Sequence, residues 1–378
     1  MVNQMNWIKV RNYFLAAALV AAFFIAVNIE SFQKKTQNDC IKCHIKTNPV
    51  MVEEWQQSTM AFSGMECIDC HGNSHNNEKN ADKAVLPSIK VCGECHQAQA
   101  DQFSAGKHGK AEEALYVSAM GKKVKTQFPA VFDRSCAVCH NEICKDGGQC
   151  DACHSGHRFS AREAKKPESC LPCHMGNHPQ YESYNFSKHG ALYKSRGLDG
   201  TVPTCTTCHM PDGNHMVKTS WGFFGVRGDE PDKKGAQDQK TVKKAVEMLG
   251  PILAPDSFRP NIEQWSQQRE SMLQVCAKCH SKSKAQKNLE SGDKVVATAN
   301  SLAAKFIKSA QELKKSKIID EKEYFWLIRD KMHAQRMSMY INAFHQYPEG
   351  VLLEMIHFKR STMENEKNLN KSNKKDTK

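Results

Sequence analysis

The chain has 378 residues, a length that by itself suggests two or three ordinary domains. Its 53 Lys and Arg outnumber its 41 Asp and Glu, and a formal net charge of +12 usually indicates nucleic acid or an anionic surface as partner. No stretch interleaves basic with aromatic residues, so we exclude a nucleic-acid-binding protein.

One motif, Cys-x-x-Cys-His, recurs eight times along the chain. Chance would produce about 0.03 matches at this composition, and the spacing is typical of covalent haem c attachment. Structural zinc sites need four ligands and disulfides need no His, so neither accounts for the pattern. The eight predicted attachment sites are Cys40, Cys43 and His44; Cys67, Cys70 and His71; Cys92, Cys95 and His96; Cys136, Cys139 and His140; Cys150, Cys153 and His154; Cys170, Cys173 and His174; Cys205, Cys208 and His209; and Cys276, Cys279 and His280.

Eight haems between Cys40 and His280 leave about one haem per 30 residues, too few residues for a conventional core. The porphyrins must then supply much of the buried apolar surface, and the chain without haem should not fold. We predict a mostly α multihaem cytochrome c with short helices, ordered loops and very little sheet. The haem propionates add about −16, so the excess of Lys and Arg compensates them.

The N-terminal residues 1–30 form a signal peptide or a membrane anchor. Lys9 and Arg11 precede residues 13–29, which are apolar except for Asn28. No good cleavage site closes this stretch, and basic residues before it keep that end in the cytoplasm, so we favour an uncleaved anchor. The remainder is exported to the periplasmic side, where c-type haem is attached.

Residues 31–285 are predicted to form the octahaem domain. Within it, a helix is expected from about Gly106 to Met120, and residues 227–242 are expected to be a surface loop. Cys144 is the only cysteine outside the motifs. It is either a reactive thiol or a small buried apolar residue, and we favour the second.

Residues 286–360 change character and are predicted to form a helical domain. Apolar residues from Leu302 to Leu313 have helical spacing, and a second helix is expected from about Asp320 to Phe344. The two would form an antiparallel hairpin or part of a bundle. Residues 361–378 are polar and rich in Lys, and we predict a disordered tail.

Nine further histidines could close the second face of the haems: His75, His108, His157, His178, His189, His215, His333, His345 and His357. A haem with two His ligands only passes electrons, whereas an open face can bind a substrate. His75 lies four residues after His71, and His157 lies three after His154. If these segments are helical, the second His of each pair shares a face with the first and must serve a different haem.

The central motifs resemble the octahaem hydroxylamine oxidoreductase family, including its hydrazine dehydrogenase relatives. The resemblance rests on Cys150–Gly176, on Asn177–Gln180, on Ser187–Gly190 and on Pro203–Met210, and it covers roughly residues 40–350. It implies that the haem on Cys136 and Cys139, with His140 as proximal ligand, is the five-coordinate catalytic one.

Two departures from the family pattern bear on the chemistry. The family's distal Asp-His pair corresponds to Asn177 and His178, so His178 is the implied proton donor and the carboxylate is missing. His357 is then the spare histidine. Oxidative members also carry a Tyr that bonds to the catalytic haem of a neighbouring subunit, and Gly350 stands in its place here.

Family members without that bond are thought to run reductively, so the sequence favours reduction of nitrite or hydroxylamine to ammonia. The alternatives are hydroxylamine oxidation with electrons passed to a cytochrome, and an electron conduit without chemistry. The implied partners are a small nitrogen oxide, a membrane quinol dehydrogenase or cytochrome c, the membrane through residues 13–29, and further copies of the chain in a trimer.

Overall fold

The computed structural model describes residues 39–111, 125–126, 130, 149–154, 156–175, 179–219, 236–248 and 262–376. The chain divides into two compact units, Met1–Pro87 with His154–Ala161, and Ser88–Cys153 with Arg162–Lys378. No helix within the described ranges is long and apolar enough to cross a membrane. The predicted anchor, residues 13–29, lies outside them.

The first unit is a set of short helices. They are α2 (Asp39–Thr47), α3 (Pro49–Gln56), α4 (Thr59–Phe62), α5 (Cys67–His71) and the 3₁₀ turn η1 (Glu78–Lys83). Side-chain caps start several of them: Asn48 accepts from the Met51 amide, Ser58 from the Ala61 amide and Asn77 from the Lys79 amide. Among its described residues, the core consists of four buried apolar side chains, Ile41, Val52, Trp55 and Ala61.

The second unit begins with a similar series of short elements. They are α6 (Ile89–Gly93), α7 (Gln97–Ala105), η2 (His108–Lys110), η4 (Cys150–Ala152), α12 (Ala161–Ala164), η5 (Pro167–Ser169), α13 (Gln180–Asn185), α14 (Lys188–Arg196), α15 (Cys205–His209) and η6 (Pro211–Gly213). Most of these carry or follow a Cys-x-x-Cys-His motif. The region contributes few fully buried apolar side chains, Ile89, Tyr184 and Val202 among them.

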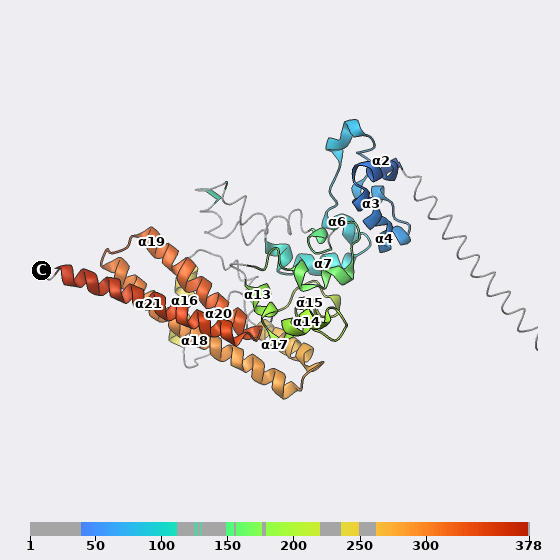
Figure 1. The fold of residues 1–378 in the computed structure, drawn as a ribbon. Helices are drawn as coiled ribbons and strands as arrows, with labels where there is room; N and C mark the ends of the chain where they lie inside the picture. Colours follow the sequence, from blue (N-terminus) through green and yellow to red (C-terminus); the bar gives the residue numbers. More distant parts are fainter. Residues whose placement is uncertain are drawn as a thin grey trace, which may run out of the picture. The chain divides into compact units, whose positions relative to one another are not determined.

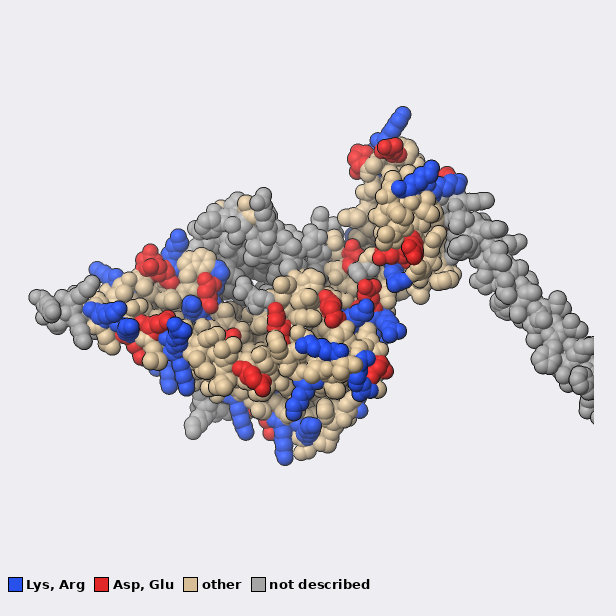
Figure 2. Space-filling view, viewed as in Figure 1, with Lys and Arg blue, Asp and Glu red and all other residues tan. Residues whose placement is uncertain are grey.

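Longer helices follow and pack side by side (Figure 1). They are α16 (Ala236–Met248), α17 (Ile262–Ala277), α18 (Lys282–Lys315), α19 (Glu321–Trp326), the π-helical η9 (Leu327–His333), α20 (Ala334–Phe344) and α21 (Pro348–Asp376). Their shared core includes Phe306, Ile328, Met339 and Phe358, each with 0% exposure. On the face shown in Figure 2, acidic and basic side chains are interspersed over these helices.

The predicted mostly α fold is confirmed, since every regular element in the described ranges is helical. Two local predictions were wrong. Residues 361–376 continue helix α21, because Asn365 is buried and its Nδ2 donates to Ser309 Oγ at 3.0 Å. Residues 236–242, predicted as loop, begin helix α16, because Val242 and Ala245 are buried in the shared core. The predicted hairpin is therefore a larger bundle.

Candidate functional site

The Cys-x-x-Cys-His motifs within the described ranges each form about one helical turn. The His amide bonds to the carbonyl of the first Cys at 2.9 Å in His96, 3.0 Å in His174 and 2.9 Å in His280. One turn places both cysteines on one face, as attachment to a single flat ring requires. Every motif cysteine within the described ranges is free of disulfide bonds. Cys136, Cys139 and His140 lie outside those ranges, as does Cys144.

Ten histidines face one another in five pairs. Each pair joins a motif histidine to one outside the motifs. The pairs and their ring-centroid distances are His44–His75 at 5.9 Å, His71–His157 at 6.0 Å, His108–His174 at 6.1 Å, His189–His280 at 6.0 Å and His209–His345 at 6.1 Å. The ring of His75 thus faces His44, and that of His157 faces His71. The sequence spacing predicted only that each would serve a haem other than that of its sequence neighbour, and it did not predict these partners.

This separation fits a metal ion between the two rings. An imidazole nitrogen binds a transition metal at about 2.0–2.1 Å, so two imidazoles on opposite sides of one ion have centroids about 6 Å apart. Direct stacking or hydrogen bonding between the rings would bring them closer. Two side-chain ligands suffice for haem iron, because the porphyrin supplies the other four. The five pairs could therefore each hold a haem, with the neighbouring motif cysteines as attachment points.

Backbone carbonyls orient several of these rings. The Nδ1 atom lies 2.8 Å from Val85 O in His71, 2.7 Å from Lys218 O in His209 and 2.8 Å from Ile341 O in His345. A proton on Nδ1 that is donated to a carbonyl leaves the Nε2 lone pair free for a metal. His215, which is in none of the five pairs, has the same arrangement, with Nδ1 2.8 Å from Gly213 O.

Burial keeps four of the rings in the neutral form. It lowers the pKa of His108 to about 4, helped by the charges of His174, His209 and Lys107. It also lowers the pKa of His345 to about 4, and the pKa values of His189 and His209 move in the same direction. Neutral imidazole is the form that ligates metal ions, so these rings are ready to bind at neutral pH.

Cysteines of different motifs lie near one another, and these contacts show which attachment sites are adjacent. In the first unit, Cys40 and Cys67 interact. In the second unit, the side chains of Cys92 and Cys150 are in hydrogen-bond contact, as are those of Cys170 and Cys205. Electrostatic neighbours also join Cys153 to Cys170, and Cys208 to both Cys276 and Cys279. The described sites of the second unit thus form an unbroken series.

Other predicted site residues are distributed as follows. His178 and Asn177 lie outside the described ranges. His96 caps helix α7, and the backbone amide of His215 donates to Gln102 Oε1 at 3.0 Å. His154 follows η4, and His333 is buried at the end of η9. His357 is 47% exposed on α21, 3.7 Å from Glu354, as suits the spare histidine.

The position where the resemblance places the cross-linking tyrosine has little free space. Gly350 is buried on α21, and a Cβ there would meet the ring of Tyr347 and the amide of Asn342. Tyr347 stacks on Phe186 with ring centroids 5.2 Å apart. Burial also raises the pKa of Tyr340, which is neutral beside the buried Arg336.

Sequence reasoning missed two features of the site. It could not pair the histidines, because a ring 6 Å from its partner leaves no pattern in sequence. It also passed over Lys107, whose Nζ donates to Thr219 Oγ1 at 2.9 Å across 112 residues. A repeated Lys-His-Gly triad, at residues 107–109 and 188–190, is the signal that could have drawn attention to it.

Two family models of cytochromes match parts of the chain. Residues 63–229 match the family model described as seven times multi-haem cytochrome CxxCH, and residues 22–72 match that of cytochrome c554 and c-prime. A probable nitrite reductase-hydroxylamine oxidoreductase fusion protein of Kuenenia stuttgartiensis is 28% identical over 313 residues, which cover 66% of this chain and 34% of that protein. The chain therefore spans about a third of the length of this relative.

Solved structures show the same fold. A reducing HAO-like (hydroxylamine oxidoreductase-like) protein complex of Kuenenia stuttgartiensis matches with a TM-score of 0.70 and 21% identity, over 92% of this chain and 88% of that chain. A hypothetical multihaem protein matches with a TM-score of 0.63 and 18% identity, over 85% and 94%. Taken with the attachment motifs, these matches show that the chain is similar in sequence to multihaem c-type cytochromes and shares the fold of an HAO-like protein.

Proposed function

We propose that this chain carries eight haems c and reduces nitrite or hydroxylamine to ammonia at the one attached to Cys136 and Cys139. The observation that carries the proposal is the set of five facing histidine pairs. A haem closed by two histidines only passes electrons, so these five sites are suited to electron transfer and not to substrate reduction. The resemblance assigns the chemistry to the motif that ends in His140.

The residues that would hold the haems have distinct roles. The motif cysteines form the thioether bonds, and the motif histidines are the proximal ligands. His75, His157, His108, His189 and His345 are the distal ligands of the sites they face, and His215 and His333 are assigned to the remaining closed sites. When bound, a haem with one open face supplies an iron that takes a small nitrogen oxide and the electrons that reduce it.

His178 is the proposed proton donor. An imidazole titrates near neutral pH, so it can give protons to nitrogen-bound oxygen as the oxygen leaves as water. Asn177 replaces the carboxylate that the family pattern has at this point. An amide donates and accepts hydrogen bonds without charge, so the pocket would carry one negative charge fewer and would repel anionic nitrite less.

Two considerations favour the reductive direction. The chain has Gly350 where oxidative members have the cross-linking tyrosine. The similar solved structure is named a reducing HAO-like complex, and the curated relative is named a probable nitrite reductase fusion. We further propose an exported protein on the periplasmic side, held by residues 13–29, supplied by a quinol dehydrogenase or cytochrome c and assembled as a trimer.

The activity test uses purified holoprotein with a reduced viologen dye and either nitrite or hydroxylamine. We expect consumption of both dye and substrate, and loss of the activity in His178→Ala with all haems retained. His357→Ala is the matched control, because that side chain is exposed on α21. Full activity in His178→Ala would remove the role given to that residue.

A spectroscopic test separates this proposal from a pure conduit. A conduit predicts only low-spin haems, whereas the proposed enzyme has one high-spin site in its electron paramagnetic resonance spectrum. His345→Ala should add about one haem equivalent of high-spin signal, because it opens the site that His209 holds. A spectrum unchanged by His345→Ala would contradict the pairing of His209 with His345.

A further inference from the structure

Two segments of the second unit share the sequence Lys-His-Gly and the same local construction. In Lys107–Gly109 the ring of His108 faces His174, and in Lys188–Gly190 the ring of His189 faces His280. In both, the glycine lies against backbone of the preceding helix, which a Cβ would strike. The two segments therefore present a distal histidine in the same way.

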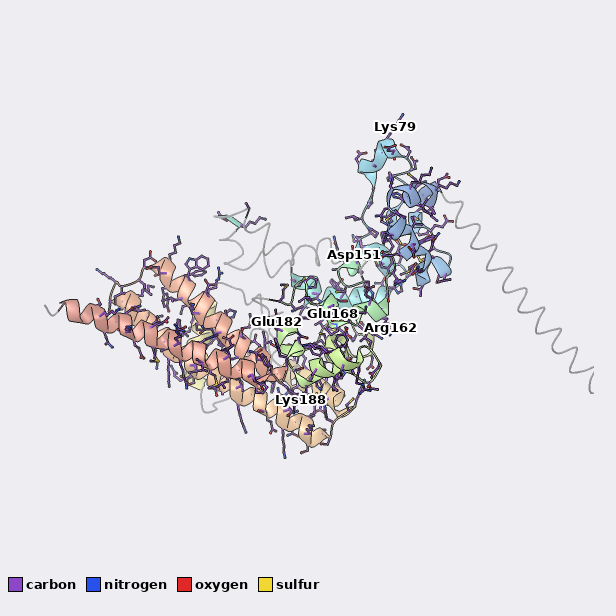
Figure 3. All side chains as sticks on the ribbon, viewed as in Figure 1. Lys79, Asp151, Arg162, Glu168, Glu182 and Lys188 are labelled. Atoms are coloured by element: carbon purple, nitrogen blue, oxygen red, sulfur yellow. The ribbon has the colours of Figure 1, made fainter. Side chains whose placement is uncertain are left out.

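The lysines of the two segments differ. Lys107 is partly buried, and its Nζ donates to Thr219 Oγ1 at 2.9 Å. Lys188 is exposed on α14, at the place labelled in Figure 3, where water screens its charge.

The partner of Lys107 belongs to the segment that orients a second histidine pair. Thr219 directly follows Lys218, whose carbonyl lies 2.7 Å from Nδ1 of His209 and whose amide donates to His209 O at 2.8 Å. His209 in turn faces His345. Lys107 directly precedes His108 and is hydrogen-bonded to the segment that orients His209, so it lies close to one histidine of each pair. A fixed cation thus lies between two neighbouring histidine pairs.

A buried positive charge beside a haem favours the reduced form, because reduction removes one unit of positive charge from the iron. The interaction is strong where water is excluded and weak at an exposed position. Buried charge near the ring is one of the means by which a protein sets haem potential. The site of His189 has only exposed lysines as cationic neighbours in the described ranges, Lys188 beside it and Lys284.

We propose that Lys107 is a positioning residue that raises the reduction potentials of two adjacent haems together, those held by His108 with His174 and by His209 with His345. This rests on the haem ligation given under the proposed function. The two haems would exchange electrons readily with each other. The reduction potential of each would be higher than the same ligands would give without the lysine.

The test is a spectroelectrochemical titration of the purified holoprotein, without substrate. In Lys107→Gln, we expect two haems to titrate at lower potential, with the haem count and the low-spin electron paramagnetic resonance signals unchanged. Lys107→Arg, which keeps the charge, should restore the wild-type curve. Lys188→Gln is the matched control and should not shift it.

A Lys107→Gln curve that superimposes on the wild type would overturn the proposal, as would an equal shift in Lys188→Gln. If Lys107→Gln fails to retain its haems, Thr219→Val serves instead. That variant keeps the lysine but frees its ammonium to move into water, so a smaller shift of the same sign is required, and an unchanged curve rejects the proposal. Because no substrate is added, failure of nitrite reduction in the wild type would leave this outcome intact.

Discussion

The helices from α16 to α21 and the short helices of residues 39–87 build their interiors in different ways. The longer helices share a core in which Phe306, Ile328 and Phe358 are completely buried. The short helices bury four apolar residues and leave Phe62 77% and Leu86 78% exposed. One region is held together by its own side chains, whereas the other has too little apolar burial to offset its chain entropy and needs its haems.

The largest expected effect comes from withholding haem. Chain produced where no haem c is attached should lose the structure of residues 39–219, because the porphyrins are missing from its interior. The helices from α18 to α21 should persist. Limited proteolysis with mass spectrometry should therefore yield a protected C-terminal fragment beginning near Lys282. Protection of residues 39–219 from proteolysis in the haem-free chain would contradict the claim that this region needs its haems to fold.

The next effect concerns the side-chain core. Phe358→Ala should destabilise the bundle by about 3–5 kcal/mol, because it leaves a cavity against Phe306, whose ring centroid is 6.1 Å away. The measurement is denaturant unfolding followed by far-ultraviolet circular dichroism. Met363→Ala on the same helix is the control: its side chain is 66% exposed, and its cost should stay within about 0.5 kcal/mol. Equal costs would mean that α21 does not pack as described.

A smaller effect tests whether the end of α21 belongs to the bundle. Asn365→Ala should cost about 1–2 kcal/mol, because it removes the 3.0 Å hydrogen bond to the buried Ser309 Oγ. Asn368→Ala, at an exposed position one turn further on, should be neutral. The same unfolding measurement applies. An Asn365→Ala variant with unchanged stability would mean that residues 361–376 do not pack on the bundle, as the disordered tail predicted from composition would not.

The smallest effect is at a helix start. Asp320 Oδ1 accepts from the Glu323 amide at 2.7 Å, and Glu323 Oε2 accepts from the Asp320 amide at 2.9 Å. Asp320→Ala should therefore cost about 1 kcal/mol, whereas the exposed Lys322→Ala should cost almost nothing. Hydrogen exchange of α19 would show the change locally. Unchanged exchange would mean that packing alone fixes this end of the helix.

Local patterns in the sequence predicted the parts of the structure that depend on neighbouring residues. The motif spacing identified the single-turn cysteine sites, and the apolar period from Leu302 to Leu313 identified part of α18. The helical segment predicted from about Asp320 to Phe344 corresponds to α19, η9 and α20, and Asp320 caps its start. Helix α21 was missed beyond residue 360, because its polar composition conceals one buried stripe that includes Phe358 and Asn365.

The pairing of histidines that are distant in sequence could not be predicted from such patterns. The spacing of His75 and His157 indicated that neither serves the haem of the motif histidine just before it. Nothing in the sequence indicated which motif histidine each would face. The tether from Lys107 to Thr219 is equally non-local, since it spans 112 residues. The roles of His178, Asn177 and His140 remain predictions from the family resemblance.

Gly350 bears on how the start of α21 could accept a larger residue. A Cβ at this position would meet the ring of Tyr347, which itself lies stacked on Phe186. A side chain introduced at 350 would therefore require the Tyr347 ring to move and would disturb its stacking on Phe186. One aromatic ring thus couples residue 350 to the residue that ends α13, so a substitution on one helix would be felt at the end of another.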